Sequence, residues 1–269
     1  MNEHLVSQPF GELIEQNEKI VFPEKNSSTD SPLAGKLRYY YGWLVAAALV
    51  LFVAAPLLVY YRFRQNREGF YKWCDWGARS WLRSCGARIQ VRGLENLEAG
   101  RSYVFASNHR SYLDTATLYA YAGKRVGLVA KRELLKVPIF GYGMGLANVI
   151  AIDRSNPERA RKSMQKAREV LESGYSFGVF AEGTRAMPGE LLPFKKGAFH
   201  LALQTGAPVV PVAIKNTDRM MGKRVGVARA GTIEMVLLPP IETSELSPET
   251  DLMELLKQTR AAIAEELAK

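Results

Sequence analysis

The strongest constraint on how this chain folds is an uncharged apolar stretch near its amino terminus. Residues 39–61 read YYYGWLVAAALVLFVAAPLLVYY and contain no charged side chain. About 20 apolar residues in a helix span the ~30 Å hydrocarbon layer of a bilayer, so this segment is long enough to cross one. Tyrosines at both ends and Trp43 near one end are typical of the bilayer interface. The pattern favours a membrane helix over a buried core helix.

How this helix sits in the membrane is less constrained by its residues. Residues 1–38 precede it and no small-residue cleavage site follows it, which argues against a signal peptide. Pro56 would kink the helix, which leaves open a bent helix that re-enters the same leaflet. If the helix spans instead, the Arg-rich downstream flank places residues 62–269 on the cytoplasmic face and the amino-terminal tail outside.

The segments on either side of the apolar stretch carry opposite charge. Residues 1–35 have a net charge of −4, from six acids and two bases, and residues 62–92 have a net charge of +6, from eight bases and two acids. We expect residues 1–38, which include the run SSTDSP, to be a polar, poorly ordered tail.

Residues 62–86 read RFRQNREGFYKWCDWGARSWLRSCG and predict an amphipathic helix. Its aromatic and cysteine residues fall on one stripe and its bases elsewhere, which is typical of a helix lying in the interface of an anionic membrane. The alternative is an ordinary amphipathic helix packed on the domain. We assign residues 39–86 to a membrane anchor and interfacial helix. The residues of the stripe are Phe63, Phe70, Trp73, Cys74, Trp81 and Cys85, and the bases are Arg67, Lys72, Arg79 and Arg83.

Composition narrows the classes of function. The chain has 269 residues, 47% of them hydrophobic, and a formal net charge of +9. Basic chains commonly bind phosphate in nucleic acid, anionic lipid or phosphorylated substrates. Nucleic acid is disfavoured, because the bases cluster beside the apolar stretch and no nucleic-acid motif is present. Cys74 and Cys85 alone make neither a disulfide framework nor a tetrahedral metal cage. We also expect no metal and no cofactor.

Residues 87–269 alternate short apolar strands with helices, which predicts an α/β domain whose central, mostly parallel or mixed sheet is flanked by helices. The expected strands are Arg88–Val91, Tyr103–Ser107, Val126–Ala130, Asn148–Ile152, Phe177–Ala181, Val209–Ile214 and Thr232–Leu238. The expected helices are Leu113–Tyr121, Pro157–Ser173, Gly197–Gln204 and Pro248–Leu267.

Polar clusters follow four of the expected strands. In open α/β sheets, ligands bind at the carboxyl ends of the strands, so these clusters predict a site at one edge of the sheet. The clusters are Asn108–Asp114, Lys131–Glu133, Asp153–Arg154 and Glu182–Arg185.

The first cluster, NHRSYLD, has two interpretations. His109 and Asp114 are five residues apart, so they can pair only if His109 lies in the loop and Asp114 in the first helical turn. The carboxylate would then accept from imidazole Nδ1–H and leave Nε2 as a general base. Alternatively, Ser111 and Asp114 form a capping box and His109 is a loop residue. These residues alone leave both interpretations open.

Four blocks together resemble the membrane-associated glycerolipid acyltransferases. NHRSYLD resembles the family's NHx4D block, AKRELLKVPIFGYGMGLANVIAIDR the second block, FAEGTR the third and APVVPVAI the fourth, over residues 104–214. Ala181 stands where the family often has proline, Ala186 where serine is common and Ala151 where an aromatic is common. These departures bear on substrate preference, because none of them removes a charged group.

The resemblance implies transfer of a fatty acyl group from a thioester, acyl-CoA or acyl carrier protein, to the free hydroxyl of 1-acylglycerol-3-phosphate (lysophosphatidic acid), giving phosphatidic acid. His109 would be the base, oriented by Asp114. Lys131, Arg154 and Arg185 would bind the acceptor's phosphate. Glu182 would orient Arg185 or contact a glycerol hydroxyl, and Gly183 and Thr184 would form the turn that meets the ligand, with the glycine letting backbone approach it.

Two alternatives remain from the sequence. One is an acyltransferase for another lysolipid, such as a lyso-ornithine lipid or a lysophospholipid being remodelled. The other is a non-enzymatic membrane module whose basic residues bind anionic lipid. The expected location is the membrane, with the domain on the cytoplasmic face.

Overall fold

The domain is built on a mixed seven-stranded sheet. The computed structural model describes residues 11–12, 16–23, 31–64, 67–130, 143, 146–151 and 157–269. The sheet order is β2-β9-β8-β3-β6-β4-β5, and every neighbouring pair is parallel except β8 and β9. Its strands are β2 (Ala87–Arg92), β3 (Val104–Ser107), β4 (Val126–Ala130), β5 (Ile150–Ala151), β6 (Ser176–Phe180), β8 (Val209–Lys215) and β9 (Gly231–Leu237).

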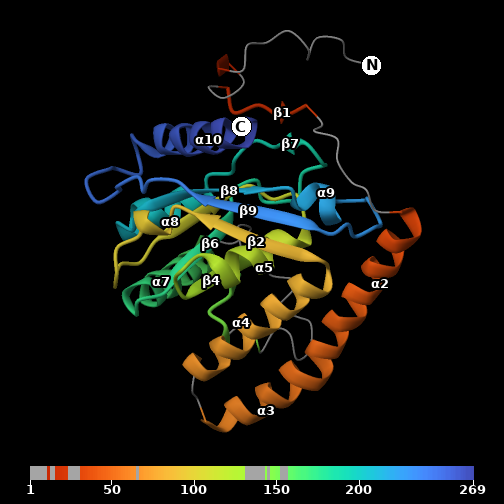
Figure 1. Ribbon diagram of the computed structural model, residues 1–269. Coiled ribbons are helices and arrows are strands. Elements are labelled where there is room, and N and C mark those ends of the chain that lie inside the picture. Colours follow the sequence, from red (N-terminus) through yellow and green to blue (C-terminus); the bar gives the residue numbers. More distant parts are fainter. Residues whose placement is uncertain are drawn as a thin grey trace.

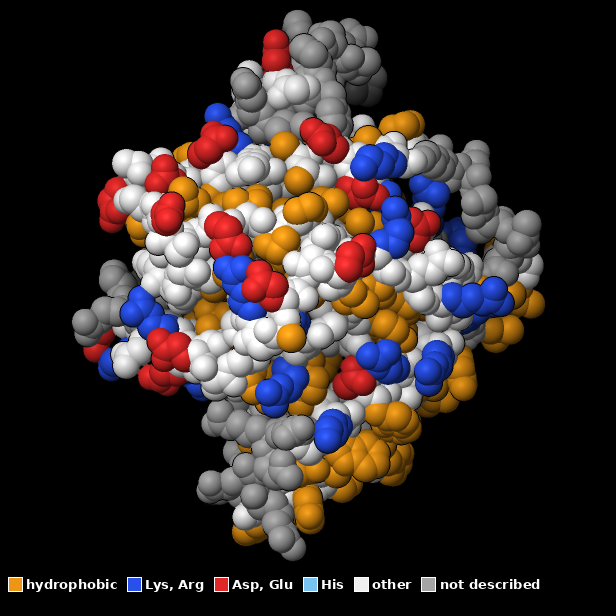
Figure 2. Space-filling view, turned by 60° about the vertical axis from the view of Figure 1, so that its left-hand side comes forward, with side chains coloured by type: hydrophobic (Ala, Val, Ile, Leu, Met, Phe, Trp, Pro, Cys, Tyr) orange, Lys and Arg blue, Asp and Glu red, His pale blue; other side chains and the backbone are white. Residues whose placement is uncertain are grey.

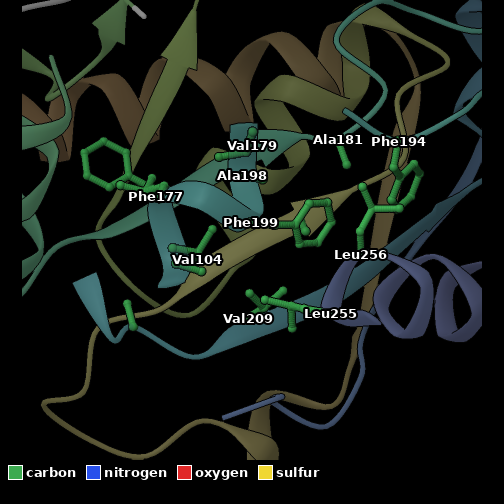
Figure 3. Close-up of a cluster of buried hydrophobic side chains, with 14 of the residues drawn as sticks. Val104, Phe177, Val179, Ala181, Phe194, Ala198, Phe199, Val209, Leu255 and Leu256 are labelled. Carbon is green, nitrogen blue, oxygen red and sulfur yellow. The ribbon is translucent and has the colours of Figure 1, made fainter. Parts of the chain in front are cut away.

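Helices cover both faces of this sheet, which confirms the predicted fold class (Figure 1). One face packs against α7 (Pro157–Glu172), α8 (Gly197–Thr205) and α10 (Leu252–Ala268). The other packs against α4 (Arg67–Ser84), α5 (Tyr112–Tyr121) and α9 (Thr217–Met221). In the first of these cores Phe199 of α8 lies among Val104, Val209, Leu255 and Leu256 (Figure 3).

The strands and helices expected from the sequence are present with small changes at their ends. The expected strand Asn148–Ile152 is reduced to β5 among the described residues, and Ile152 lies outside them. The last helix begins at Leu252 rather than Pro248. The sequence analysis did not anticipate the short helices η3 (Leu94–Asn96) and α9, or the two-stranded sheet of β1 (Ile20–Val21) and β7 (Glu190–Leu191).

The apolar stretch forms one long bent helix outside the sheet layers. It consists of α2 (Pro32–Ala48), a π-helical segment η2 (Leu49–Ala54) and α3 (Ala55–Arg64), and Pro32–Tyr61 is long and apolar enough to cross a membrane. A π-helical segment at a bend and Pro56 just beyond it are recognised causes of helix curvature. Hydrophobic side chains gather at the lower end of the molecule, where α3 lies, with Lys and Arg side chains above them (Figure 2).

Helix α4 runs back from this end toward the sheet, and its apolar stripe is divided between two environments. Phe70 and Cys85 are buried, and Trp81 donates from Nε1 to the Gly42 carbonyl of α2 at 3.0 Å. Trp73 is 44% exposed. Much of the stripe therefore packs against the protein, as in the alternative interpretation, and an exposed remainder is left for a membrane interface.

Part of the amino-terminal tail is folded, in contrast to the sequence expectation. Ile20 of β1 pairs with Leu191 of β7 and is only 1% exposed. Asn17 donates to the Phe194 carbonyl at 3.0 Å and accepts from the Phe194 N–H at 2.8 Å. We call residues 16–23 the amino-terminal strap. The polar composition of residues 1–38 concealed it, because Ile20 is the one buried apolar residue of the strap.

The strap constrains how the bent helix can sit in a membrane. Residues 16–23 precede the helix and β2 follows it, yet both belong to the same folded body. A helix that crossed a bilayer once would separate them. The β1–β7 pairing is therefore the contact that the two arrangements left open by the sequence treat differently.

Candidate active site

The site begins where β3 ends. Strands β3, β6 and β8 run parallel. Ser107 and Phe180 lie side by side at the carboxyl ends of β3 and β6, and Val212 in the middle of β8 lies beside Ser107. Asn108 is fully buried and fixes the next turn, because its amide donates to the Ile214 carbonyl at 2.9 Å and accepts from the Ile214 N–H at 2.8 Å. The polar loops after β3 and β6 thus lie side by side, as the sequence predicts.

One carboxylate oxygen organises the loop after β3. Asp114 is fully buried, and its Oδ2 accepts from the backbone N–H of Arg110 at 2.6 Å and of Ser111 at 2.7 Å. His109 Nδ1 lies 2.9 Å from the same oxygen. Ser111 caps α5 and completes a capping box with Asp114. The structure thus contains both the His109–Asp114 contact and the capping box, because one oxygen serves the helix start and the imidazole. The role of His109 as a base stays a prediction.

This pairing fixes the protonation of the His109 ring. An ionised carboxylate only accepts, so Nδ1 must carry the hydrogen and, in the neutral ring, Nε2 carries a lone pair. The ring is stacked on Phe180 of β6, with centroids 3.9 Å apart and planes 17° apart. The side chain of His109 is 15% exposed, against 0% for Asp114. Nε2 is thus the nitrogen that can act as a base.

Glu182 lies in the interior and binds backbone, and its expected contact with substrate or Arg185 stays a prediction. It is 1% exposed; Oε1 accepts from the His109 N–H at 2.6 Å, and Oε2 accepts from the Leu192 N–H at 2.8 Å. The residue therefore joins the loop after β3 to the segment that follows β7. Its contacts are with backbone, so its role is to position His109.

The environment of Glu182 disfavours its charged form. Burial raises the pKa of Glu182 to about 8, while the N–H donors of His109 and Leu192 and the Arg110 guanidinium act in the lowering direction. A carboxyl removed from water prefers to be neutral unless its donors compensate fully.

The rest of the predicted cluster faces outward. Gly183 and Thr184 are exposed, and Gly183 has φ +70°, a left-handed conformation that suits glycine. Arg185 is half-buried, with its guanidinium carbon 3.6 Å from the centroid of the Tyr112 ring. Lys223 donates to the Arg185 carbonyl at 2.6 Å. An arginine whose guanidinium lies over an aromatic ring can still donate hydrogen bonds to an oxyanion in its own plane.

The bent helix reaches this part of the site. Trp43 of α2 packs edge-on against Tyr112, with ring centroids 5.3 Å apart. Arg185, Tyr112 and Trp43 therefore form a continuous stack from the loop after β6 to the apolar helix. Sequence analysis missed Phe180, Tyr112, Trp43 and Lys223. Phe180 lies within the FAEGTR block and Tyr112 within NHRSYLD. For Phe180, an aromatic at the end of a strand was the available signal.

Two predicted site residues are not placed. Lys131 and Arg154 lie outside the described residues. The structure brings together His109, Asp114, Glu182 and the turn that carries Arg185, and the contribution of the two other cations stays a prediction.

Comparison with known proteins identifies a family with similar sequence. Residues 88–215 match the family model described as Acyltransferase. This match makes residues 88–215 similar to that family's domain. The matched residues contain the His109–Asp114 pair, Glu182 and Arg185, which is the part of the chain that the resemblance of its four blocks indicated.

Several relatives carry specific names. The 1-acyl-sn-glycerol-3-phosphate acyltransferase alpha of Homo sapiens is 37% identical over 61% of this chain and 58% of its own length. The 1-acyl-sn-glycerol-3-phosphate acyltransferase of Saccharomyces cerevisiae is 38% identical over 61% of this chain and 55% of its own length. The chain thus matches little more than half the length of these curated relatives.

A solved structure confirms the fold. The crystal structure of the 1-acyl-sn-glycerophosphate (LPA) acyltransferase from Thermotoga maritima aligns with a TM-score of 0.73, at 24% identity, over 88% of this chain and 98% of that one. The similarity extends beyond the matched family domain and establishes a common fold.

Proposed function

We propose that this protein transfers a fatty acyl group from an acyl thioester to the free hydroxyl of 1-acylglycerol-3-phosphate, giving phosphatidic acid. The observation that carries the proposal is the 2.9 Å contact between His109 Nδ1 and the buried Asp114. The names of the relatives at 37% and 38% identity support the acceptor.

The proposed reaction needs one base and no protein nucleophile. Nε2 of His109 takes the proton of the lipid hydroxyl as its oxygen bonds to the thioester carbonyl carbon. The tetrahedral intermediate then expels the thiolate, which recovers the proton from His109. Asp114 stabilises the imidazolium between these steps, because its oxygen lies against Nδ1. General-base assistance of this kind contributes about 10²–10⁴-fold in rate.

The acceptor's phosphate requires a cation near the base. Arg185 is the candidate among the described residues, because its guanidinium is fixed on Tyr112 beside the apolar helix. Lys131 and Arg154 remain proposed partners for the same phosphate. The thioester donor, from coenzyme A or acyl carrier protein, is a substrate in this scheme, and no metal or other cofactor is required.

The membrane arrangement supports a lipid acceptor. The exposed apolar side chains of α2 and α3 lie at one end of the molecule, and the stack from Trp43 through Tyr112 leads to Arg185. We propose that the bent helix sits in one leaflet and that anionic lipid contacts the bases beside it. A lysolipid would then reach the site without leaving the membrane surface.

The test is an acyl-transfer assay with a panel of lysolipids and a labelled acyl thioester. Wild type should acylate 1-acylglycerol-3-phosphate, and His109→Ala should lose at least about 10²-fold in turnover while binding vesicles as before. His200→Ala is the matched control, since His200 lies on α8 away from the site. If wild type acylated only another lysolipid, that lipid would replace 1-acylglycerol-3-phosphate as the proposed acceptor. An active His109→Ala enzyme would refute the mechanism.

The non-enzymatic alternative makes the opposite prediction. If the chain only binds anionic lipid, His109→Ala should have no effect and charge reversal at Lys72 and Arg83 should abolish its function. Running both variants in the same assay separates the two hypotheses.

A further inference from the structure

A second cavity lies next to the active-site loop but is lined by other side chains. It measures about 640 Å³ and is bounded by the strap, α9, the start of β9 and the end of α10. Three arginines line it, Arg110, Arg219 and Arg229, together with one acid, Asp218. A cavity of this size is in the range of small-molecule sites. The surplus of positive charge favours an anion.

The cavity differs from a surface cluster of basic side chains because one of its arginines, Arg110, is buried. Its side chain is only 7% exposed, and its Nε donates to the Glu190 carbonyl at 2.6 Å. Nη1 lies 3.4 Å from Asp218 Oδ2, a long contact that is shared with the Gly189 N–H at 2.9 Å. Nη2 is buried and has no hydrogen-bond partner among the described residues.

A buried guanidinium with a free donor is an unusual arrangement. Buried polar groups are nearly always hydrogen-bonded, and exceptions call for a specific explanation. Asp218 only partly neutralises Arg110, because the same oxygen also accepts from Gly189. An anion in the cavity, which Arg110 lines, would supply a second negative charge beside this guanidinium.

The cavity is separate from the proposed acyl-transfer site. The rings of His109 and Phe180 and the guanidinium of Arg185 do not line it. Arg110 follows His109 directly in the chain, but the His109 ring stacks on Phe180 while the Arg110 guanidinium lies over Phe22 of the strap, 5.2 Å from the ring centroid. Adjacent residues therefore serve two different surfaces.

We propose that Arg110, Arg219 and Arg229 form a second anion-binding site for a phosphate-bearing ligand. Guanidinium groups bind phosphate with paired, charge-assisted hydrogen bonds, and three of them on one cavity exceed what Asp218 can balance. Two sources share this chemistry. One is free inorganic phosphate, and the other is the phosphorylated nucleotide end of a coenzyme A thioester.

The nucleotide source rests on the proposed function, because only a thioester substrate would bring that group to the protein. The binding of free inorganic phosphate does not depend on the proposed function. A chain that binds phosphate in this cavity but transfers no acyl group would keep the anion site and lose only the acyl-transfer proposal, so the two failures are distinguishable.

The experiment is titration calorimetry of the full chain in detergent, at constant ionic strength set with chloride. The probes are inorganic phosphate and adenosine 3′,5′-bisphosphate. We expect saturable binding by wild type and at least a tenfold loss of affinity in Arg219→Gln/Arg229→Gln. Arg224→Gln is the matched control, because Arg224 is exposed on the segment between α9 and β9 but does not line the cavity.

The measured affinities distinguish free phosphate from the nucleotide end of a thioester, and one set of results would refute the site. Nucleotide binding at least tenfold tighter than phosphate identifies the thioester end, and equal affinity identifies free phosphate. Binding that persists in Arg185→Gln shows that the probe is not reporting the acyl-transfer site. No saturable binding by wild type, or equal binding by the double variant, would overturn the proposal.

Discussion

Replacing Glu182 by glutamine should alter how stability depends on pH. The carboxyl is almost fully buried, and burial raises its pKa from an ordinary value of 4.5 to about 8. Glutamine has nearly the same shape and keeps an acceptor for one of the two backbone N–H donors, but it does not titrate. A comparison of the two proteins across pH therefore isolates the proton of Glu182 from the constant cost of the substitution.

The sign follows from which state holds the proton more tightly. Below pH 4.5 the carboxyl is neutral in both the folded and unfolded chain. Between pH 4.5 and 8 the unfolded chain loses the proton and the folded chain keeps it, so wild type loses stability relative to Glu182→Gln as pH rises. At about 1.4 kcal/mol for each of about 3.5 pH units, the relative loss is about 5 kcal/mol at most.

Thermal unfolding in detergent at a series of pH values from 5 to 8 measures this effect. For a chain of this size about 2–4 °C of midpoint corresponds to 1 kcal/mol, so the relative midpoint should fall by roughly 10 °C over the series. Glu254→Gln, at an exposed position of α10, is the control and should show no such slope. A constant difference between wild type and Glu182→Gln would refute the reasoning and show that the two N–H donors keep the carboxylate ionised.

Three further predictions concern Asp114, Arg185 and Ile20. Asp114→Asn should lower turnover by about 10²–10⁴-fold, measured in the acyl-transfer assay, because an amide no longer stabilises the imidazolium; unchanged turnover would mean that Asp114 only caps α5. Arg185→Gln should raise the KM for the lysolipid about tenfold or more while Arg185→Lys raises it less, and equal KM values in all three proteins would remove Arg185 from the phosphate site. Ile20→Asp should destabilise the chain by about 2 kcal/mol or more in thermal unfolding, because Ile20 is 1% exposed. The adjacent Val21→Asp should not, because Val21 is 64% exposed. Equal losses of stability in the two variants would show that the strap does not pack as described.

The sheet could be predicted from the sequence because its strands are apolar runs that end at polar clusters. The same rule brought His109 and Glu182 to one edge, since β3 and β6 are parallel neighbours. The rule does not say which way a side chain turns after the strand ends. Glu182 turns inward to backbone donors, and the contacts that satisfy it come from His109 and Leu192, which no local pattern links.

The strap could not be predicted for a related reason. Strands β1 and β7 have two residues each, which is too short for an alternating pattern, and they pair across most of the chain. Helix α9 has five residues and follows Asn216, which has φ +71°, so it shows no helical periodicity either. Elements of this length are held by tertiary contacts rather than by their own residues.

The pairing of β1 with β7 also sets an order of events during synthesis. Lys19 and Glu190, whose side chains meet at 3.1 Å, are 171 residues apart, so a ribosome adding about 5–20 residues per second needs on the order of ten seconds or more to make the second after the first. The apolar helix leaves the ribosome early in that interval, while the strap before it is not yet paired with β7. A helix that entered a membrane at this stage would do so before β1 could pair with β7.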